Sequence, residues 1–138
     1  MPEPLPTTSD VVQLTQRLHA FFSHLDERRY EDLAAMFLPQ GRWLRQGRWV
    51  EGRAGVVQAL QARPASLRVR HLLSNVLVTA HSPDEMRVEA YLTAYRQLEG
   101  QAPSLFSINT VANTFQRSAG EWMLAEQQLV REFEFEAS

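Results

Sequence analysis

The chain has 138 residues, the size of one ordinary domain, and 44% of them are hydrophobic, which is enough to build a core. A net charge of −2 provides no single-sign field, so neither nucleic acid nor an anionic membrane surface is an expected partner. The absence of cysteine excludes disulfides, zinc–thiolate sites and thiol nucleophiles, and the absence of lysine excludes Schiff-base chemistry. Without a signal-like start or an apolar run of about 18 residues, we expect a cytoplasmic protein with no membrane segment.

The first half of the chain has the pattern of a helical region interrupted by one hairpin. Apolar side chains recur at helical spacing, which predicts helices over residues 9–27, 27–39 and 52–64. Ser9 or Asp10 is the expected N-cap of the first helix, and residues 1–8 are expected to form a disordered tail. Gly-Arg-Trp occurs twice, at residues 41–43 and 47–49, around Gln46 and Gly47, which indicates the turn of a short hairpin.

The second half predicts four long strands. These cover residues 66–80, 85–98, 104–117 and 121–135. Short connections that carry Pro or Gly separate them, so antiparallel hairpins are expected. Three helices followed by a curved sheet make an α+β domain, and no linker divides residues 9–135.

Candidate ligand-binding residues come from the faces of these strands. Alternation places His71 and Asn75 on one face with aliphatic side chains, so both are expected to point to the helix-covered side. Arg96 ends the apolar row of the next strand and is expected at a rim or mouth. Asn109 and Asn113 share a face that is more polar than a dry core requires. A concave face with this mixture is typical of a small-molecule pocket.

The aromatic residues divide between the inside and the outside of the predicted fold. Trp43 and Trp49 are expected in the core or in the pocket wall. Tyr91 and Tyr95 share the opposite face of their strand and alternate with charged residues. That pattern is more typical of an interface between sheets than of a catalytic site.

Asp26 lies in "SHLDERRY", where the first two predicted helices meet, and is the candidate partner of His71. A carboxylate bonded to one ring nitrogen fixes the tautomer and leaves the other nitrogen as a general base. Two plainer interpretations stay open: Asp26 as the N-cap of the second helix, and His71 as a hydrogen-bonded core residue. Four scattered histidines without acids at ligand spacing give no prediction of a metal site.

The order of motifs resembles a known family. "FFSHLDERRYEDLAAMF", a hairpin, a short helix ending in "ARP", "RHLLSNVLV" and "AGEWMLAEQQLV" look like the SnoaL-like branch of the nuclear transport factor 2-like superfamily. The resemblance covers about residues 9–135. It implies a cone in which a strongly bent mixed sheet surrounds a pocket, closed by the N-terminal helices. It also implies a homodimer formed through the outer face of the sheet, and no metal or organic cofactor.

Two relatives within that branch suggest different roles. Scytalone dehydratase and similar enzymes use an Asp–His pair that matches Asp26 and His71 by position. This chain departs from them at Leu25, where they have a tyrosine, and at Arg96, where they have a second histidine. The small subunit of aromatic-ring dioxygenases has a strand like "RHLLSNV" and a structural role, but this chain lacks that subunit's Arg-x-Asp-x-Leu run.

The leading hypothesis is therefore an enzyme that dehydrates, isomerises or cyclises a small, apolar, cyclic carbonyl compound. His71 would move the proton, Asp26 would orient it, and Asn75, Arg96, Asn109 or Asn113 would hold substrate oxygens. The alternative is a non-catalytic ligand-binding or assembly module of the same fold, including a role like that of the dioxygenase small subunit.

Overall fold

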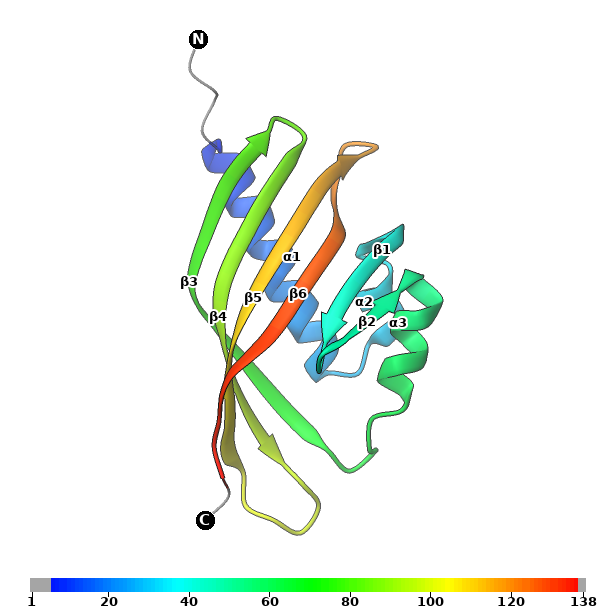
Figure 1. Ribbon diagram of the computed structural model, residues 1–138, viewed down its shortest axis with the longest axis vertical. Coiled ribbons are helices and arrows are strands. Elements are labelled where there is room, and N and C mark those ends of the chain that lie inside the picture. The colour runs from blue at the N-terminus through cyan, green and yellow to red at the C-terminus, as the bar shows by residue number, and fades with distance from the viewer. Residues whose placement is uncertain (1–5, 137–138) are drawn as a thin grey trace.

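The computed structural model describes residues 6–136 and consists of three helices and one six-stranded sheet (Figure 1). The elements in chain order are α1 (Thr8–Asp26), α2 (Tyr30–Ala34), β1 (Phe37–Arg45), β2 (Arg48–Glu51), α3 (Gly52–Gln61), β3 (Arg68–Ser82), β4 (Glu85–Gln97), β5 (Ser104–Ser118) and β6 (Glu121–Glu134). None of the helices within residues 6–136 is long and apolar enough to cross a membrane.

The sheet is mixed and has the strand order β2-β1-β6-β5-β4-β3. β1 runs parallel to β6, and the other neighbouring strands are antiparallel. Figure 1 shows the long strands bending strongly, with α1 lying across one face and α2 and α3 gathered beside β1 and β2. The predicted α+β architecture, three helices on a strongly curved mixed sheet, is confirmed, and the sheet remains open between its edge strands β2 and β3.

The first helix begins earlier than the sequence pattern suggests. Thr7 is the N-cap and forms a capping box with Asp10, whose carboxylate accepts the backbone N–H of Thr7. Ser9 and Asp10 therefore lie inside the helix and are not its caps. Residues 6–8 of the predicted tail belong to this ordered start, and residues 1–5 lie outside the described residues.

The second helix is shorter than predicted, because a strand takes over its last residues. α2 ends at Ala34, and Phe37 is the first residue of β1. The backbone carbonyl of Met36 accepts the N–H of Leu124 at 2.8 Å, and Phe37 pairs with Leu124 in the parallel ladder to β6. Sheet pairing with a distant segment thus overrides the local helical spacing.

The predicted hairpin forms between β1 and β2. Gln46 and Gly47 make the turn with φ angles of 52° and 74°. Positive φ at both central positions is the geometry of a tight hairpin turn, and Gly47 adopts it without a steric penalty.

One core fills the space between α1 and the concave face of the sheet. Phe21 on α1 packs edge-on against the ring of Trp43 on β1, with 5.4 Å between ring centroids. Leu18 and Leu14 lie one and two turns earlier on the same helix face, respectively, and are fully buried. The apolar stripe of α1 therefore holds the helix across the sheet. The last turn of α1 lies beside β3, where Asp26 contacts His71.

A bulge in β3 reverses the side-chain alternation that the sequence pattern assumes. The register to β4 shifts between Ser74 and Leu77, and Asn75 has a φ of 55°. Beyond this point Val76 is partly buried against the core, whereas Asn75 and Leu77 are exposed. The prediction that Asn75 shares the face of His71 is therefore wrong.

Candidate functional site

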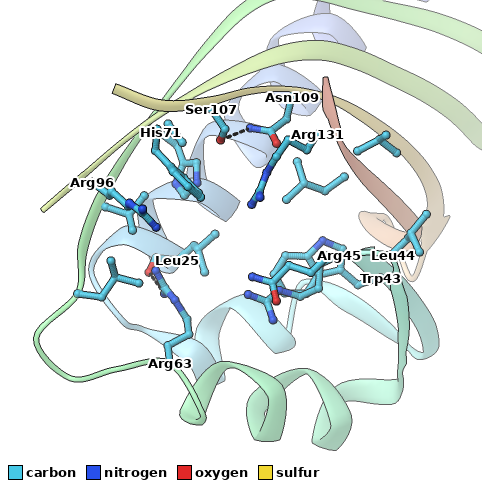
Figure 2. A pocket seen from close by; sticks show the side chains of 18 residues that line it. Leu25, Trp43, Leu44, Arg45, Arg63, His71, Arg96, Ser107, Asn109 and Arg131 are labelled. Carbon is cyan, nitrogen blue, oxygen red and sulfur yellow. Dashed lines mark hydrogen bonds between the residues drawn. The ribbon is translucent and has the colours of Figure 1, made fainter. Parts of the chain in front are cut away.

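A cavity of about 590 Å³ opens at the curved end of the sheet (Figure 2). The end of α1, the β1–β2 hairpin, the segment after α3 and strands β3 to β6 all contribute to its wall. The lining residues are Leu25, Trp43, Leu44, Arg45, Gln46, Gly47, Arg63, Leu67, Val69, His71, Ala94, Arg96, Phe106, Ser107, Asn109, Leu129, Val130 and Arg131. This volume accommodates a small organic molecule.

Asp26 and His71 are in direct contact at the wall of this cavity. Nδ1 of His71 lies 2.5 Å from Oδ1 of Asp26, and the backbone N–H of His71 donates to Oδ2 at 2.9 Å. The two side chains are only 9% and 10% exposed, and the ring of Phe22 lies 5.3 Å from the imidazole. Asp26 does not cap α2, whose N-cap is Arg29. His71 also lines the cavity, so it is not enclosed by aliphatic side chains.

The position of Asp26 follows from how α1 ends. The N–H of Arg29 donates to the carbonyl of His24 at 2.8 Å and that of Arg28 to the carbonyl of Leu25 at 3.3 Å, which is a Schellman motif. Arg28 occupies the left-handed position with a φ of 60°, where glycine is usual. Its guanidinium donates to the carbonyls of Pro64 (2.8 Å) and Leu67 (2.5 Å), just before β3. These hydrogen bonds of Arg28 fix the end of α1 beside the strand that carries His71.

The contact determines what the imidazole can do chemically. A carboxylate at Nδ1 holds the hydrogen on that nitrogen and orients the ring. Among residues 6–136, Nε2 of His71 has no hydrogen-bond partner, so its lone pair is available to a molecule in the cavity. The tautomer follows from the hydrogen-bond geometry.

Three of the other predicted site residues line the same cavity. Arg96 lies at its edge, with its guanidinium carbon 3.8 Å from the centroid of the Phe106 ring. Asn109 is buried and donates from Nδ2 to the carbonyl of Leu92 and to Oγ of Ser107, both at 3.1 Å. Trp43 forms part of the wall and is 1% exposed.

Three predicted site residues lie elsewhere. Asn75 is exposed at the bulge in β3, for the reason given above. Trp49 is 39% exposed and stacks with Arg42 at 4.0 Å, so the prediction of a core or pocket position is wrong. Asn113 is fully buried in the core, outside the residues that line the cavity, and donates to the carbonyl of Val88 at 3.0 Å.

Several lining residues escaped sequence reasoning. Ser107 is buried two residues before Asn109 on the same strand face, and this alternation was the signal for it. Arg131 lies opposite Asn109 in the β5–β6 register. Arg45, two residues after Trp43, and Arg63, after α3, resemble ordinary surface charges until the tertiary structure is known.

The described part of the chain contains no group of three or more histidine, aspartate or glutamate side chains arranged to hold a metal ion. The polar groups that converge on the cavity are instead one imidazole, four guanidinium groups, a hydroxyl and amides. This set is suited to binding oxygen atoms of an organic ligand and to moving a proton.

The family and structural comparisons agree with this fold. A model of the SnoaL-like domain matches residues 6–127, whereas none of the curated proteins matches the chain in sequence. A scytalone dehydratase-like protein from Novosphingobium aromaticivorans DSM 12444 has a TM-score of 0.82 at 16% identity, covering 94% of this chain and 90% of that one.

Two further solved structures are similar. ActVI-ORFA from Streptomyces coelicolor has a TM-score of 0.80 at 19% identity, covering 91% of this chain and 98% of that one. A protein of unknown function with a cystatin-like fold from Nostoc punctiforme has a TM-score of 0.79 at 22% identity, covering 91% and 93%. At these identities the likenesses show a shared fold. Because the family model spans most of the 138 residues, the chain belongs to the SnoaL-like domain family.

Proposed function

We propose that the protein is a cofactor-independent enzyme that moves a proton at the carbon next to a carbonyl group of a small cyclic compound. The reaction is a dehydration, an isomerisation or a cyclisation. The observation that carries this proposal is the 2.5 Å contact between Asp26 and His71 at the wall of an open cavity.

In this proposal Nε2 of His71 is the general base. It accepts a proton from the carbon next to the carbonyl, and the C–H electron pair moves to the carbonyl oxygen to form an enolate. The negative carboxylate of Asp26 balances the charge of the imidazolium ring and keeps it oriented. In an isomerisation the ring then returns the proton to a different carbon of the same enolate.

The enolate oxygen needs a donor, and Ser107 supplies one in this proposal. Its Oγ accepts the hydrogen bond from Nδ2 of Asn109 at 3.1 Å, so its own hydroxyl hydrogen is free to point to the ligand. Ser107 is 2% exposed and lines the cavity, where a fixed donor stabilises developing negative charge more strongly than it does in water.

The exchange of carbon-bound hydrogen for deuterium tests the proposal without knowledge of the natural substrate. 2-Tetralone has an apolar ring and acidic hydrogens at C1, and their loss in D₂O is measured by proton NMR. The wild-type protein is expected to accelerate exchange, and His71→Asn to lower this acceleration by at least about 100-fold. His81→Asn, at an exposed histidine on the same strand, is the matched control. Equal acceleration by wild type and His71→Asn contradicts the proposal.

A non-catalytic binding module is the second candidate. It is favoured by Leu25 and Arg96, which line the cavity where the dehydratase pattern has a tyrosine hydroxyl and a second imidazole. For this function, a ligand-induced rise in melting temperature persists in the double variant Asp26→Asn/His71→Asn, and no exchange of 2-tetralone is catalysed by the wild type. Catalysed exchange that depends on His71 excludes it.

A further inference from the structure

The residues that line the cavity carry an excess of positive charge. Arg45, Arg63, Arg96 and Arg131 line it, and within residues 6–136 no lining residue is an aspartate or a glutamate. The whole chain, by contrast, has 16 acidic and 14 basic residues. Figure 2 shows these guanidinium groups extending into the cavity from different elements of the fold.

Arginine side chains in this protein repeatedly stack on aromatic rings and bind a carboxylate at their edge. Arg42 lies 4.0 Å above the ring of Trp49 and donates to Glu126 at 2.8 Å. Arg117 lies 4.2 Å above the ring of Trp122 and pairs with Asp10 at 3.3 Å. Stacking covers the flat face of the guanidinium and leaves the N–H groups at its edge for a planar acceptor.

Arg45 and Arg96 have the stacking but lack the carboxylate. Arg45 stacks on Trp43 at 5.2 Å and Arg96 on Phe106 at 3.8 Å. Among residues 6–136, neither side chain has an ion-pair or hydrogen-bond partner. Both arginines line the cavity, so their free edges are accessible to a molecule bound there.

The other two arginines are already engaged. Arg131 pairs with Glu134 at 3.2 Å, and Arg63 donates to the carbonyl of Leu25 at 3.2 Å and to the hydroxyl of Tyr30 at 3.0 Å. They contribute positive charge without being free to form a full set of new bonds. Burial, and next the positive charge of Arg63, lowers the pKa of Arg45, because both disfavour its charged form.

We infer that the cavity binds an organic acid, an apolar ring system that carries a carboxylate, and that the free positive charges of Arg45 and Arg96 select for the carboxylate. The ring lies against the apolar wall formed by residues such as Leu25, Val69 and Leu129. This inference rests on the proposed function, because it names the substrate class of the same cavity. It adds that the natural substrate carries a carboxylate in addition to the carbonyl group next to which the proton moves.

A matched pair of probes tests the inference. 2-Naphthylacetate and 2-naphthylacetamide have nearly the same shape, and only the first is charged at neutral pH. Isothermal titration calorimetry with the wild-type protein is expected to give a dissociation constant at least about tenfold lower for the acid than for the amide. Higher ionic strength is expected to weaken binding of the acid and to leave the amide unchanged.

Variants then assign the effect to residues. Arg45→Gln and Arg96→Gln are each expected to reduce the preference for the acid to below about threefold. Arg42→Gln is the matched control, because Arg42 stacks on a tryptophan of the same hairpin but already has Glu126 as its partner. Melting curves establish that each variant is folded, and the ionic-strength dependence of the wild type supplies a test that needs no variant.

The outcomes separate this inference from the proposed function. Equal affinity for acid and amide, no binding of the acid, or a preference that survives in both Arg45→Gln and Arg96→Gln overturns the inference. The variant His71→Asn is expected to retain the preference for the acid, because His71 is not part of the carboxylate site. Loss of catalysed exchange in His71→Asn together with equal affinities for the two probes leaves the proton-transfer function and rejects the acid substrate.

Discussion

Asp26 bonds to His71 twice, once through the imidazole Nδ1 and once through the backbone N–H. Each carboxylate oxygen accepts one of these bonds, so the strand position and the ring orientation are fixed by the same side chain. A histidine held in this way loses little freedom when a ligand binds, which is what a preorganised base requires.

Replacing Asp26 by Asn removes the negative charge and one of the two oxygen atoms that accept hydrogen bonds from His71. An amide accepts hydrogen bonds through its oxygen only, so its NH₂ group faces one of the two N–H donors of His71. We expect catalysed exchange of 2-tetralone to fall by about 100-fold and the unfolding free energy to fall by about 1–3 kcal/mol. NMR exchange rates and urea denaturation measure the two effects. The exposed Asp32→Asn is the control, and unchanged exchange in Asp26→Asn contradicts the role assigned to the carboxylate.

Asn75 is expected to matter for the backbone and not for a ligand. Its φ of 55° lies in the left-handed region, which glycine adopts easily and β-branched residues do not. Asn75→Val is expected to lower the unfolding free energy by about 1–3 kcal/mol, and Asn75→Gly to leave it within about 0.5 kcal/mol of wild type. Binding of 2-naphthylacetate is expected to be the same in Asn75→Gly and in wild type. Weaker binding in Asn75→Gly would restore Asn75 as a ligand-binding residue.

Asn113 is expected to stabilise the core through its hydrogen bonds. It donates to the carbonyl of Val88 and accepts from Nε2 of Gln127 at 2.7 Å, and both side chains are fully buried. Asn113→Ala leaves Gln127 without this partner, so a loss of about 1–3 kcal/mol in unfolding free energy is expected. Thr114→Ala, the next residue on the opposite face of the strand, is the control. A stability equal to that of the control contradicts the structural role.

We propose that the convex face of the sheet joins two copies of the chain. Large exposed apolar side chains gather there on neighbouring strands, with Leu72, Tyr91 and Phe133 exposed by 53%, 47% and 57%. In the register, Leu72 lies opposite Thr93, Thr93 opposite Ile108, and Ile108 opposite Phe133, which makes one row across the sheet. A face of this kind is more typical of an interface than of a free surface.

Sedimentation analysis tests the dimer. The wild-type protein is expected to sediment as a dimer, and Tyr91→Arg to sediment as a monomer, because a guanidinium at the centre of an apolar contact lacks a partner. Val12→Arg introduces the same charge at an exposed apolar position on α1 and is expected to leave the dimer intact. A monomeric wild type, or a Tyr91→Arg variant that remains dimeric, is the contrary result.

Local patterns account for the parts of the fold that were predicted well. The stripe through Leu14, Leu18 and Phe21 and the turn at Gln46 and Gly47 depend on neighbours within one helix or hairpin. The strand at Phe37 could not be predicted in the same way, because its partner Leu124 lies far along the chain. Sheet formation there is decided by tertiary contacts, which local periodicity does not contain.

The residues of the candidate site likewise divide into those that local patterns predict and those that depend on tertiary structure. His71 and Asn109 were found because strict alternation holds along their stretches of strand up to each bulge. Asn75 was misplaced because a single residue in the left-handed region reverses the alternation, and asparagine gives only a weak signal of this geometry. Arg45 gives no such signal, because its local sequence does not distinguish a cavity arginine from an arginine on the surface.

The most direct test of the central claim is the protonation pattern of the His71 ring in two-bond ¹H–¹⁵N NMR spectra, recorded with and without 2-naphthol. This compound is a stable planar analogue of the enol of 2-tetralone. The account predicts a hydrogen on Nδ1, a bare Nε2, and a clear change in the Nε2 resonance when 2-naphthol binds. A hydrogen on Nε2 in the free protein, or an Nε2 resonance that does not respond to bound 2-naphthol, would contradict the assignment of His71 as the base.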